Sequence, residues 1–160
     1  MENNGYYDIN FTPLIGCFYI NTMISEFGFE SVPFYKIFII FPLLFDYDFL
    51  SYILKKKRTN EFYKLINSFV NEKEESLFWI EYNMKFLSNR KYCFDSIYFG
   101  LMIGAFELTE NGLKNTRVLF NEIPIEMSEF LNSIKKLGKS IRDIEVFELL
   151  RIMKMGEKIC

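Results

Sequence analysis

The stretch FDSIYFGLMIGAFELTENGLKN, residues 94–115, decides the fold, because an almost uncharged segment runs directly into an acidic turn. Its first half is apolar nearly all round, which is typical of a helix that packs between neighbours. Gly100 and Gly104 are four residues apart and would allow close packing on one face. In the second half, Asn111-Gly112 is the signal for a type I′ turn, in which both central residues need positive φ. We therefore predict a buried helix that leads into a β-hairpin with an exposed acidic tip.

Upstream of this stretch, the pattern predicts several helices within residues 13–70. Thr12 can accept a hydrogen bond as the N-cap of the first helix, and Pro13 is pre-set for the first helical position. Pro42 must end or kink the second helix, because proline lacks the backbone N–H and clashes with the preceding turn. A later helix, residues 76–87, carries four apolar residues on one face: Leu77, Ile80, Met84 and Leu87.

Three helices followed by a hairpin are the order of a winged helix, so we assign residues 60–120 to a winged-helix-like part. Further helices are predicted over residues 125–155, and the first of them is amphipathic. We see no internal domain boundary. The predicted fold class is mainly α: a single domain over residues 1–160, with a winged-helix-like β-hairpin and C-terminal helices.

The composition limits the classes of function. Half of the residues are hydrophobic, a high proportion for a small free monomer, and this leaves apolar surface for a partner. The net charge of −2 argues against a dedicated nucleic-acid binder. Three cysteines far apart in the chain indicate a reduced, cytoplasmic protein. The most apolar run, residues 37–45, is too short to span a bilayer, so we expect no contact with a membrane.

The sequence offers little for catalysis. It has no histidine, the commonest general base, and no Gly-rich phosphate loop before a helix. Asp46 and Asp48 with Lys55 could form the triad of a small metal nuclease, but acidic residues beside a helix start are usually caps. Cys93 lies in an apolar segment and is expected to be a buried, inert thiol. We therefore predict no catalytic residue, no cofactor, no metal site and no small-molecule substrate.

One dense basic cluster is a candidate contact site for a partner or a nucleic acid. It comprises Lys55, Lys56, Lys57 and Arg58. Lysines at the end of a helix are favoured by the helix dipole, so the cluster can be simply a solvated helix end. Alternatively, it can contact a phosphate backbone or the acidic surface of another protein. The sequence leaves both interpretations open.

The tip of the predicted wing is the second candidate contact site, with Glu107, Glu110 and Asn111. In a DNA-binding winged helix, the helix before the wing enters the major groove. Here that helix has no Arg or Lys after Lys91, and the acidic tip would be repelled by phosphates. We therefore predict that the wing contacts a protein, or only water.

The order of these motifs resembles the middle component of bacterial three-component ABC systems, which also encode an SMC-like ABC ATPase and an effector. The residues that carry the resemblance are Asn10 and Pro13 at the first helix, Pro42 in IFPLLF, the basic KKKRT element, Phe99-Gly100 with Gly104 and Gly112 around the hairpin, and Gly138 in IKKLGKSI. The chain departs from the family pattern at Phe11 and Thr12, which intervene before the proline, and at Phe41, which replaces the usual leucine.

The resemblance implies a non-catalytic adaptor in antiphage or mobile-element defence. Such a subunit would link the SMC-like ATPase to an effector, for example a nuclease, in a heteromeric complex, and would meet DNA only through that complex. Two other classes stay open from the residues alone, a winged-helix DNA-binding regulator and a small metal nuclease. Neither the residues nor the resemblance indicates which surface meets which partner, the stoichiometry, the nature of the effector or the activating trigger.

Overall fold

The computed structural model describes residues 12–28, 30–56, 61–119 and 130–155. Within these residues the fold is mainly helical, with one small antiparallel hairpin, which confirms the predicted fold class. The elements, in chain order, are α2 (Pro13–Ile24), the 3-10 turn η1 (Ser25–Phe27), α3 (Phe34–Leu44), α4 (Tyr47–Lys55), α5 (Phe62–Glu72), α6 (Glu75–Ser88), α7 (Arg90–Met102), β1 (Phe106–Thr109), β2 (Gly112–Asn115), α8 (Leu131–Ile141) and α9 (Val146–Ile152).

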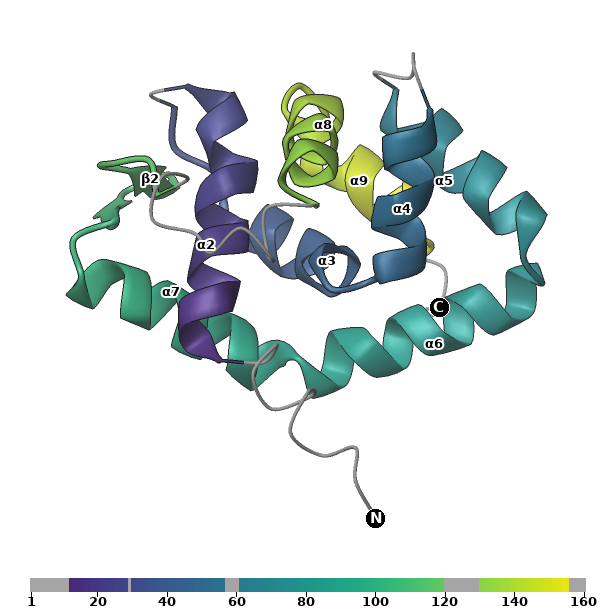
Figure 1. The fold of residues 1–160 in the computed structure, drawn as a ribbon, viewed down its shortest axis with the longest axis horizontal. Helices are drawn as coiled ribbons and strands as arrows, with labels where there is room; N and C mark the ends of the chain where they lie inside the picture. Colours follow the sequence, from purple (N-terminus) through teal and green to yellow (C-terminus); the bar gives the residue numbers. More distant parts are fainter. Residues whose placement is uncertain (1–11, 29, 57–60, 120–129, 156–160) are drawn as a thin grey trace.

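Helix α2 is the centre of the fold. Every residue from Ile15 to Ile24 is buried, and the helix packs along α7 and α8 (Figure 1). The contact with α8 is close because Gly138 has no side chain: a Cβ at Gly138 would lie 2.4 Å from the carbonyl oxygen of Met23. Close packing at Gly100 is also confirmed, since a Cβ there would lie 2.2 Å from the ring of Phe106.

Helices α6 and α7 lie end to end and form a bent rod along one edge of the molecule (Figure 1). Their joint is Asn89, whose N–H donates to the carbonyl of Lys85 and whose carbonyl accepts from the N–H of Cys93, both at 2.9 Å. The helical hydrogen-bond pattern thus continues on both sides of the joint. α7 packs mainly on α2, and the β-hairpin follows directly on its C-terminal end.

The hairpin forms where it was predicted, but its turn differs from the prediction. Thr109 pairs with Gly112, so the two connecting residues are Glu110 and Asn111, and neither has positive φ. The type I′ prediction is therefore wrong. The positive φ of 135° belongs to Gly112, at the first position of β2. A Cβ there would lie 2.1 Å from the carbonyl oxygen of Val32, so the glycine is needed for the close approach of the α2–α3 connection.

Two sets of hydrogen bonds hold the hairpin against the helices. Val32 forms an isolated antiparallel bridge with Leu113, at 2.7 and 2.9 Å. The buried side chain of Asn21, on α2, donates to the Asn115 side chain and to the Arg117 carbonyl, and accepts from the N–H of Leu119, at 2.9–3.0 Å. Each polar group of the Asn21 amide thus has a partner at the end of β2 or in the segment that follows it.

Several local predictions hold and others fail. Pro13 begins α2 as expected, but the side chain of Thr12 makes no capping bond; its backbone carbonyl accepts from Ile15 instead. Pro42 lies within α3, which ends two residues later at Leu44. Gly104 does not pack, because it lies beyond the end of α7 with φ of 67° and open space around its Cα.

The prediction that α7 is buried on all sides is also wrong. Cys93, Ile97 and Gly100 face the core, whereas Phe94 and Tyr98 are more than half exposed. An edge helix has neighbours on one side only, so its second apolar face remains uncovered. The proposed subdivision at residues 60 and 120 stays a prediction, and Asn10 lies outside the described residues.

Across the part of the chain that the structure describes, no single helix has the length and apolar character needed to cross a membrane. Only α3 and α4 taken together reach that length and composition, and they meet at an angle of 88°.

Candidate protein-interaction surfaces

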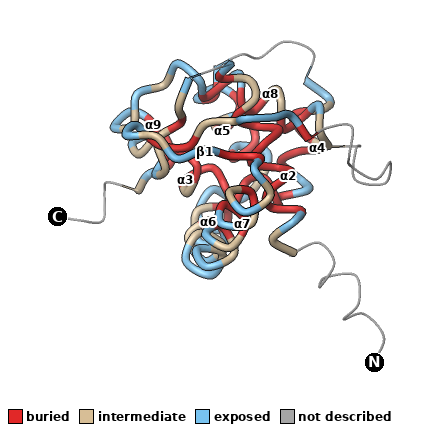
Figure 2. Tube along the Cα trace, turned by 90° about the vertical axis from the view of Figure 1, so that its left-hand side faces the viewer, coloured by how far each residue is buried: buried red, intermediate tan, exposed pale blue. Residues whose placement is uncertain are grey.

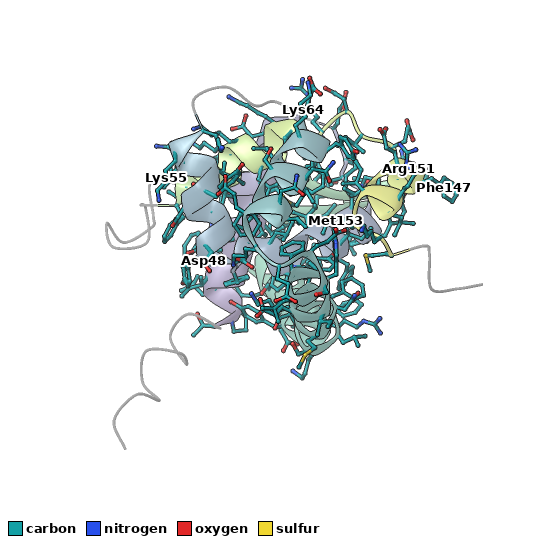
Figure 3. The ribbon with its side chains drawn as sticks, turned by 90° about the vertical axis from the view of Figure 1, so that its right-hand side faces the viewer. Asp48, Lys55, Lys64, Phe147, Arg151 and Met153 are labelled. Carbon is teal, nitrogen blue, oxygen red and sulfur yellow. The ribbon has the colours of Figure 1, made fainter. Side chains whose placement is uncertain are left out.

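The basic cluster is only partly within the described residues: Lys57 and Arg58 lie outside them. Lys55 is exposed at the end of α4, on the side of the molecule opposite to Phe147 (Figure 3). Lys56 is engaged within the chain, since its ammonium lies 4.5 Å from the centre of the Tyr52 ring and 3.8 Å from Glu72. The closeness of its ammonium to Tyr52 and to the carboxylate of Glu72 raises the pKa of Lys56. Lys55 and Lys56 thus differ in their surroundings, and their role as a contact site stays a prediction.

The backbone of Lys56 makes a further contact, because its carbonyl accepts a hydrogen bond from Lys136 of α8 at 3.3 Å. The end of α4 is thereby tied to α8. This contact fits the simpler interpretation of a helix end, in which positive groups satisfy the last carbonyls.

The tip of the hairpin is exposed, as predicted. Glu110 and Asn111 form the turn, and Glu107 lies opposite Lys114 in the strand register, which places a carboxylate and an ammonium on one face. Thr109 ties the turn to the α2–α3 connection, because its hydroxyl lies 2.8 Å from the Ser31 hydroxyl. The tip is thus a small, polar feature, and its role as a contact site stays a prediction.

The largest apolar surface lies on α6 and α7. Seven large apolar residues are exposed there, each between 50% and 69%, and we call them the α6–α7 stripe: Leu77, Ile80, Met84, Leu87, Phe94, Tyr98 and Met102. The opposite face of the same helices is buried, through Phe78, Tyr82, Cys93 and Gly100. Figure 2 shows the exposed residues on the outward side of both helices. Contiguous apolar surface of this kind marks a site of protein contact in soluble proteins.

A hollow of about 370 Å³ lies between α5, α6 and α9. Two of its charged groups are paired within the chain: Lys154 pairs with Glu75 and also lies 5.4 Å from the centre of the Trp79 ring. The remaining lining residues include Tyr63, Asn67 and Arg151, with no arrangement typical of a nucleotide or metal site. The hollow therefore adds no chemistry to the candidate surfaces.

The acidic residues that could have formed a metal site are engaged elsewhere. The side chain of Asp46 accepts the N–H of Phe49 at 3.0 Å and so caps α4, and it also pairs with Lys85. Asp48 pairs with Lys73 at 2.9 Å, and this hydrogen bond lowers the pKa of Asp48. The described residues contain no group of three or more metal-ligating side chains that could hold an ion.

The two described cysteines are buried and make no disulfide. Burial raises the pKa of the Cys17 thiol to about 12 and raises the pKa of Cys93 as well. Both are protonated at neutral pH, and a protonated thiol is a poor nucleophile. Cys93 is thus buried and unreactive, as the sequence predicts.

Sequence reasoning found the first half of the α6–α7 stripe but not its exposure. The spacing of Leu77, Ile80, Met84 and Leu87 was recognised as one helical face. The same spacing continues past Asn89 into Phe94 and Tyr98, and that continuation is the signal for a single long face. Asn21 was also missed, because an isolated asparagine in an apolar helix carries no pattern that identifies its partners.

The chain matches one family model over residues 2–156, nearly its whole length. That model is described as the ABC-three component (ABC-3C) system Middle Component 3. No curated protein and no solved structure matches the chain.

Proposed function

Because the chain belongs to the ABC-three component system Middle Component 3 family, we propose that it is a non-catalytic adaptor subunit. It links an SMC-like ABC ATPase to an effector such as a nuclease, in a cytoplasmic complex that acts in antiphage or mobile-element defence. The family name supports a place among other components of one system.

The observation that supports binding as its role is the α6–α7 stripe. Seven large apolar side chains on one surface are more than a chain of this size normally leaves uncovered, and association with a partner removes them from water. Among the described residues, Asp46 caps α4, Asp48 pairs with Lys73, and the two described cysteines are buried. The adaptor thus works through its surfaces.

DNA is met only through the complex in this proposal. Glu110 is exposed at the hairpin tip and would be repelled by a phosphate backbone. Lys56 is held by contacts within the chain, so it is not free to follow a groove. The charge of the described hairpin is therefore opposite to what a DNA-reading wing needs.

Reconstitution tests the adaptor role. The three components are co-expressed and purified through a tag on this chain, and the complex is sized by mass photometry. We expect the ATPase and the effector to co-purify with it, and we expect ATP-dependent effector activity to require it. Equal effector activity from the ATPase and effector alone would contradict the proposal.

A charge reversal at the hairpin separates the adaptor from a DNA-binding regulator. Glu110→Lys turns a repulsive charge into an attractive one, so a DNA-reading wing would bind duplex DNA more tightly. For the adaptor we expect no gain in DNA binding by the isolated chain, measured by fluorescence anisotropy over a salt series. Tighter duplex binding with unchanged partner binding would favour the regulator.

A further inference from the structure

The exposed residues of α6 and α7 repeat at the interval of a coiled-coil seam. The steps along the α6–α7 stripe are 3, 4, 3, 7, 4 and 4 residues, and Lys91 divides the step of 7 into 4 and 3. Alternate steps of 3 and 4 place side chains in the row that a second helix packs against, with knobs in holes. The exposed face of any helix has this interval, and it lets a second helix pack along the row. The spacing therefore fits a helix as the occupant.

The row is continuous in space as well as in sequence. The two hydrogen bonds through Asn89 keep α6 and α7 helical up to their joint, and the two helices lie end to end (Figure 1). From Leu77 to Met102 the row is about 38 Å long at 1.5 Å per residue. A helix of about 25 residues that follows the bend between α6 and α7 is long enough to cover it (Figure 1).

The centre of the row is positively charged. Lys91 interrupts the apolar residues, and its ammonium lies 2.5 Å from the carboxylate of Asp95. Arg90, beside it, is exposed and stacks over the Phe86 ring at 5.1 Å. No carboxylate among the described residues pairs with Arg90. A carboxylate on the docked helix, opposite Arg90, would form an ion pair with it.

This charge argues against a second copy of the chain as the occupant. In an antiparallel pair that uses the whole row, the two-fold axis passes near Asn89, so Arg90 of each copy would face its counterpart. In a parallel pair, Lys91 would lie against Lys91 of the other copy. Like charges opposed in this way destabilise both pairs.

The flanks argue against a lipid surface. Glu81 and Asp95 lie beside the row, one turn from its apolar residues, and anionic lipid would repel both carboxylates, although Arg90 and Lys91 lie near the centre of the row. A helix from another protein is the occupant that meets both the spacing and the charge.

We propose that the α6–α7 stripe is the docking surface for an amphipathic helix of a partner subunit, which pairs with α6 and α7 as a coiled coil and places a carboxylate opposite Arg90. This inference rests on the proposed function, because it identifies the surface through which the adaptor holds one component of its complex.

The first test removes apolar residues from the row in the full-length chain. Met84→Glu and Leu87→Glu together should weaken binding to the co-expressed ATPase or effector by roughly 10- to 100-fold, because two central anchors would become charges. Phe147→Glu is the matched control: Phe147 is 87% exposed on α9 and points away from the body of the molecule (Figure 3). The control should bind as the wild type does.

The second test addresses the charge. Arg90→Glu should weaken binding by about three- to tenfold at low salt, and Arg90→Lys should retain most of it. Lys64→Glu, an exposed lysine of α5 paired with Glu61, controls for the change in net charge. Equal losses in Arg90→Glu and Lys64→Glu would overturn the assignment of a carboxylate opposite Arg90.

The third test shows whether the occupant is a helix. A photo-crosslinking amino acid is placed in turn at Ile80, Leu87 and Phe94, which are seven residues apart, and the crosslinked partner residues are mapped by mass spectrometry. We expect partner residues that are also seven apart in one segment. Crosslinks scattered over several segments would overturn the proposal.

The outcomes separate this inference from the proposed function. If neither the ATPase nor the effector binds the wild-type chain, both fail. If one of them binds and the row variant binds equally well, only this inference fails. A concentration-dependent dimer that Met84→Glu dissolves, or binding to anionic vesicles that the row variant loses, would also overturn it.

Discussion

Helices α2 and α7 are similar in length and both carry many apolar residues, although α7 also carries charged ones, and they are buried to different extents. α2 has 12 residues and is buried throughout from Ile15 onward. α7 has 13 residues, and the side chains of Phe94, Tyr98 and Met102 are exposed. The difference lies in their neighbours: α2 contacts α3, α7, α8 and β2, whereas the contacts of α7 leave its outward face uncovered. The apolar face of a helix can thus be buried by other elements of its own chain, or it can stay exposed until another protein binds it.

The largest effect is expected inside α2. Asn21→Leu removes the partner of the Arg117 carbonyl, the Leu119 N–H and the Asn115 side chain. Because an unpaired buried polar group costs about 1–3 kcal/mol, we expect a loss of roughly 3–4 kcal/mol in the free energy of unfolding. Chemical denaturation of the isolated chain measures it.

The control for this change is Asn132→Leu, at an exposed position of α8, where we expect a change within about 0.5 kcal/mol. Equal stability of the two variants would show that the side-chain hydrogen bonds of Asn21 do not stabilise the fold. Buried hydrogen bonds would then no longer distinguish the covered helix α2 from the exposed helix α7.

A somewhat smaller effect is expected where α2 meets α8. Gly138→Ala places a Cβ against the Met23 carbonyl, and backbone cannot move aside as a side chain can. We expect a loss of about 2–3 kcal/mol in unfolding free energy, although alanine is the better helix former. Thermal melting compares it with Lys139→Ala on the exposed side of α8. A stabilised Gly138→Ala protein would mean that the two helices are not in close contact.

Substitutions on the exposed face of α6 and α7 should have almost no effect on stability. Leu87→Gln and Tyr98→Gln change residues that are at least 60% exposed, so we expect each to alter the unfolding free energy by no more than about 0.5 kcal/mol. Their solution behaviour should improve, because less apolar surface is available for association. A loss of several kcal/mol would show that this face is part of the folded core, and the distinction from α2 would disappear.

A comparably small effect, which depends on pH, is expected at the Asp48–Lys73 pair, where α4 meets the end of α5. The hydrogen bond from Lys73 lowers the folded-state pKa of Asp48, so its stabilisation is present above the usual carboxylate pKa and is lost as the pH falls through the lowered value. Since the pair is exposed, Asp48→Asn should cost roughly 0.2–1 kcal/mol at neutral pH and nothing at about pH 2. Denaturation at both values measures the difference, and a cost that persists in acid would contradict a role for the carboxylate charge.

The sequence predicts the helices and the hairpin because their signals are local. Pro13 begins α2, and Asp46 caps α4 as one of the two predicted alternatives. The turn residues were misassigned because the contact between Gly112 and Val32 joins distant parts of the chain. The exposure of Phe94 and Tyr98 could not be predicted for the same reason: apolar character shows that a face avoids water but not which chain covers it.

The long separation between α2 and its partners has a consequence for synthesis on the ribosome. α2 ends at Ile24, but α8, which closes over it at Gly138, spans Leu131–Ile141. More than a hundred residues must be translated in between, which takes about 5–20 s at 5–20 residues per second. Throughout that interval the apolar helix α2 lacks the part of its cover that α8 supplies. We therefore expect the nascent protein to bind chaperones until translation is nearly complete.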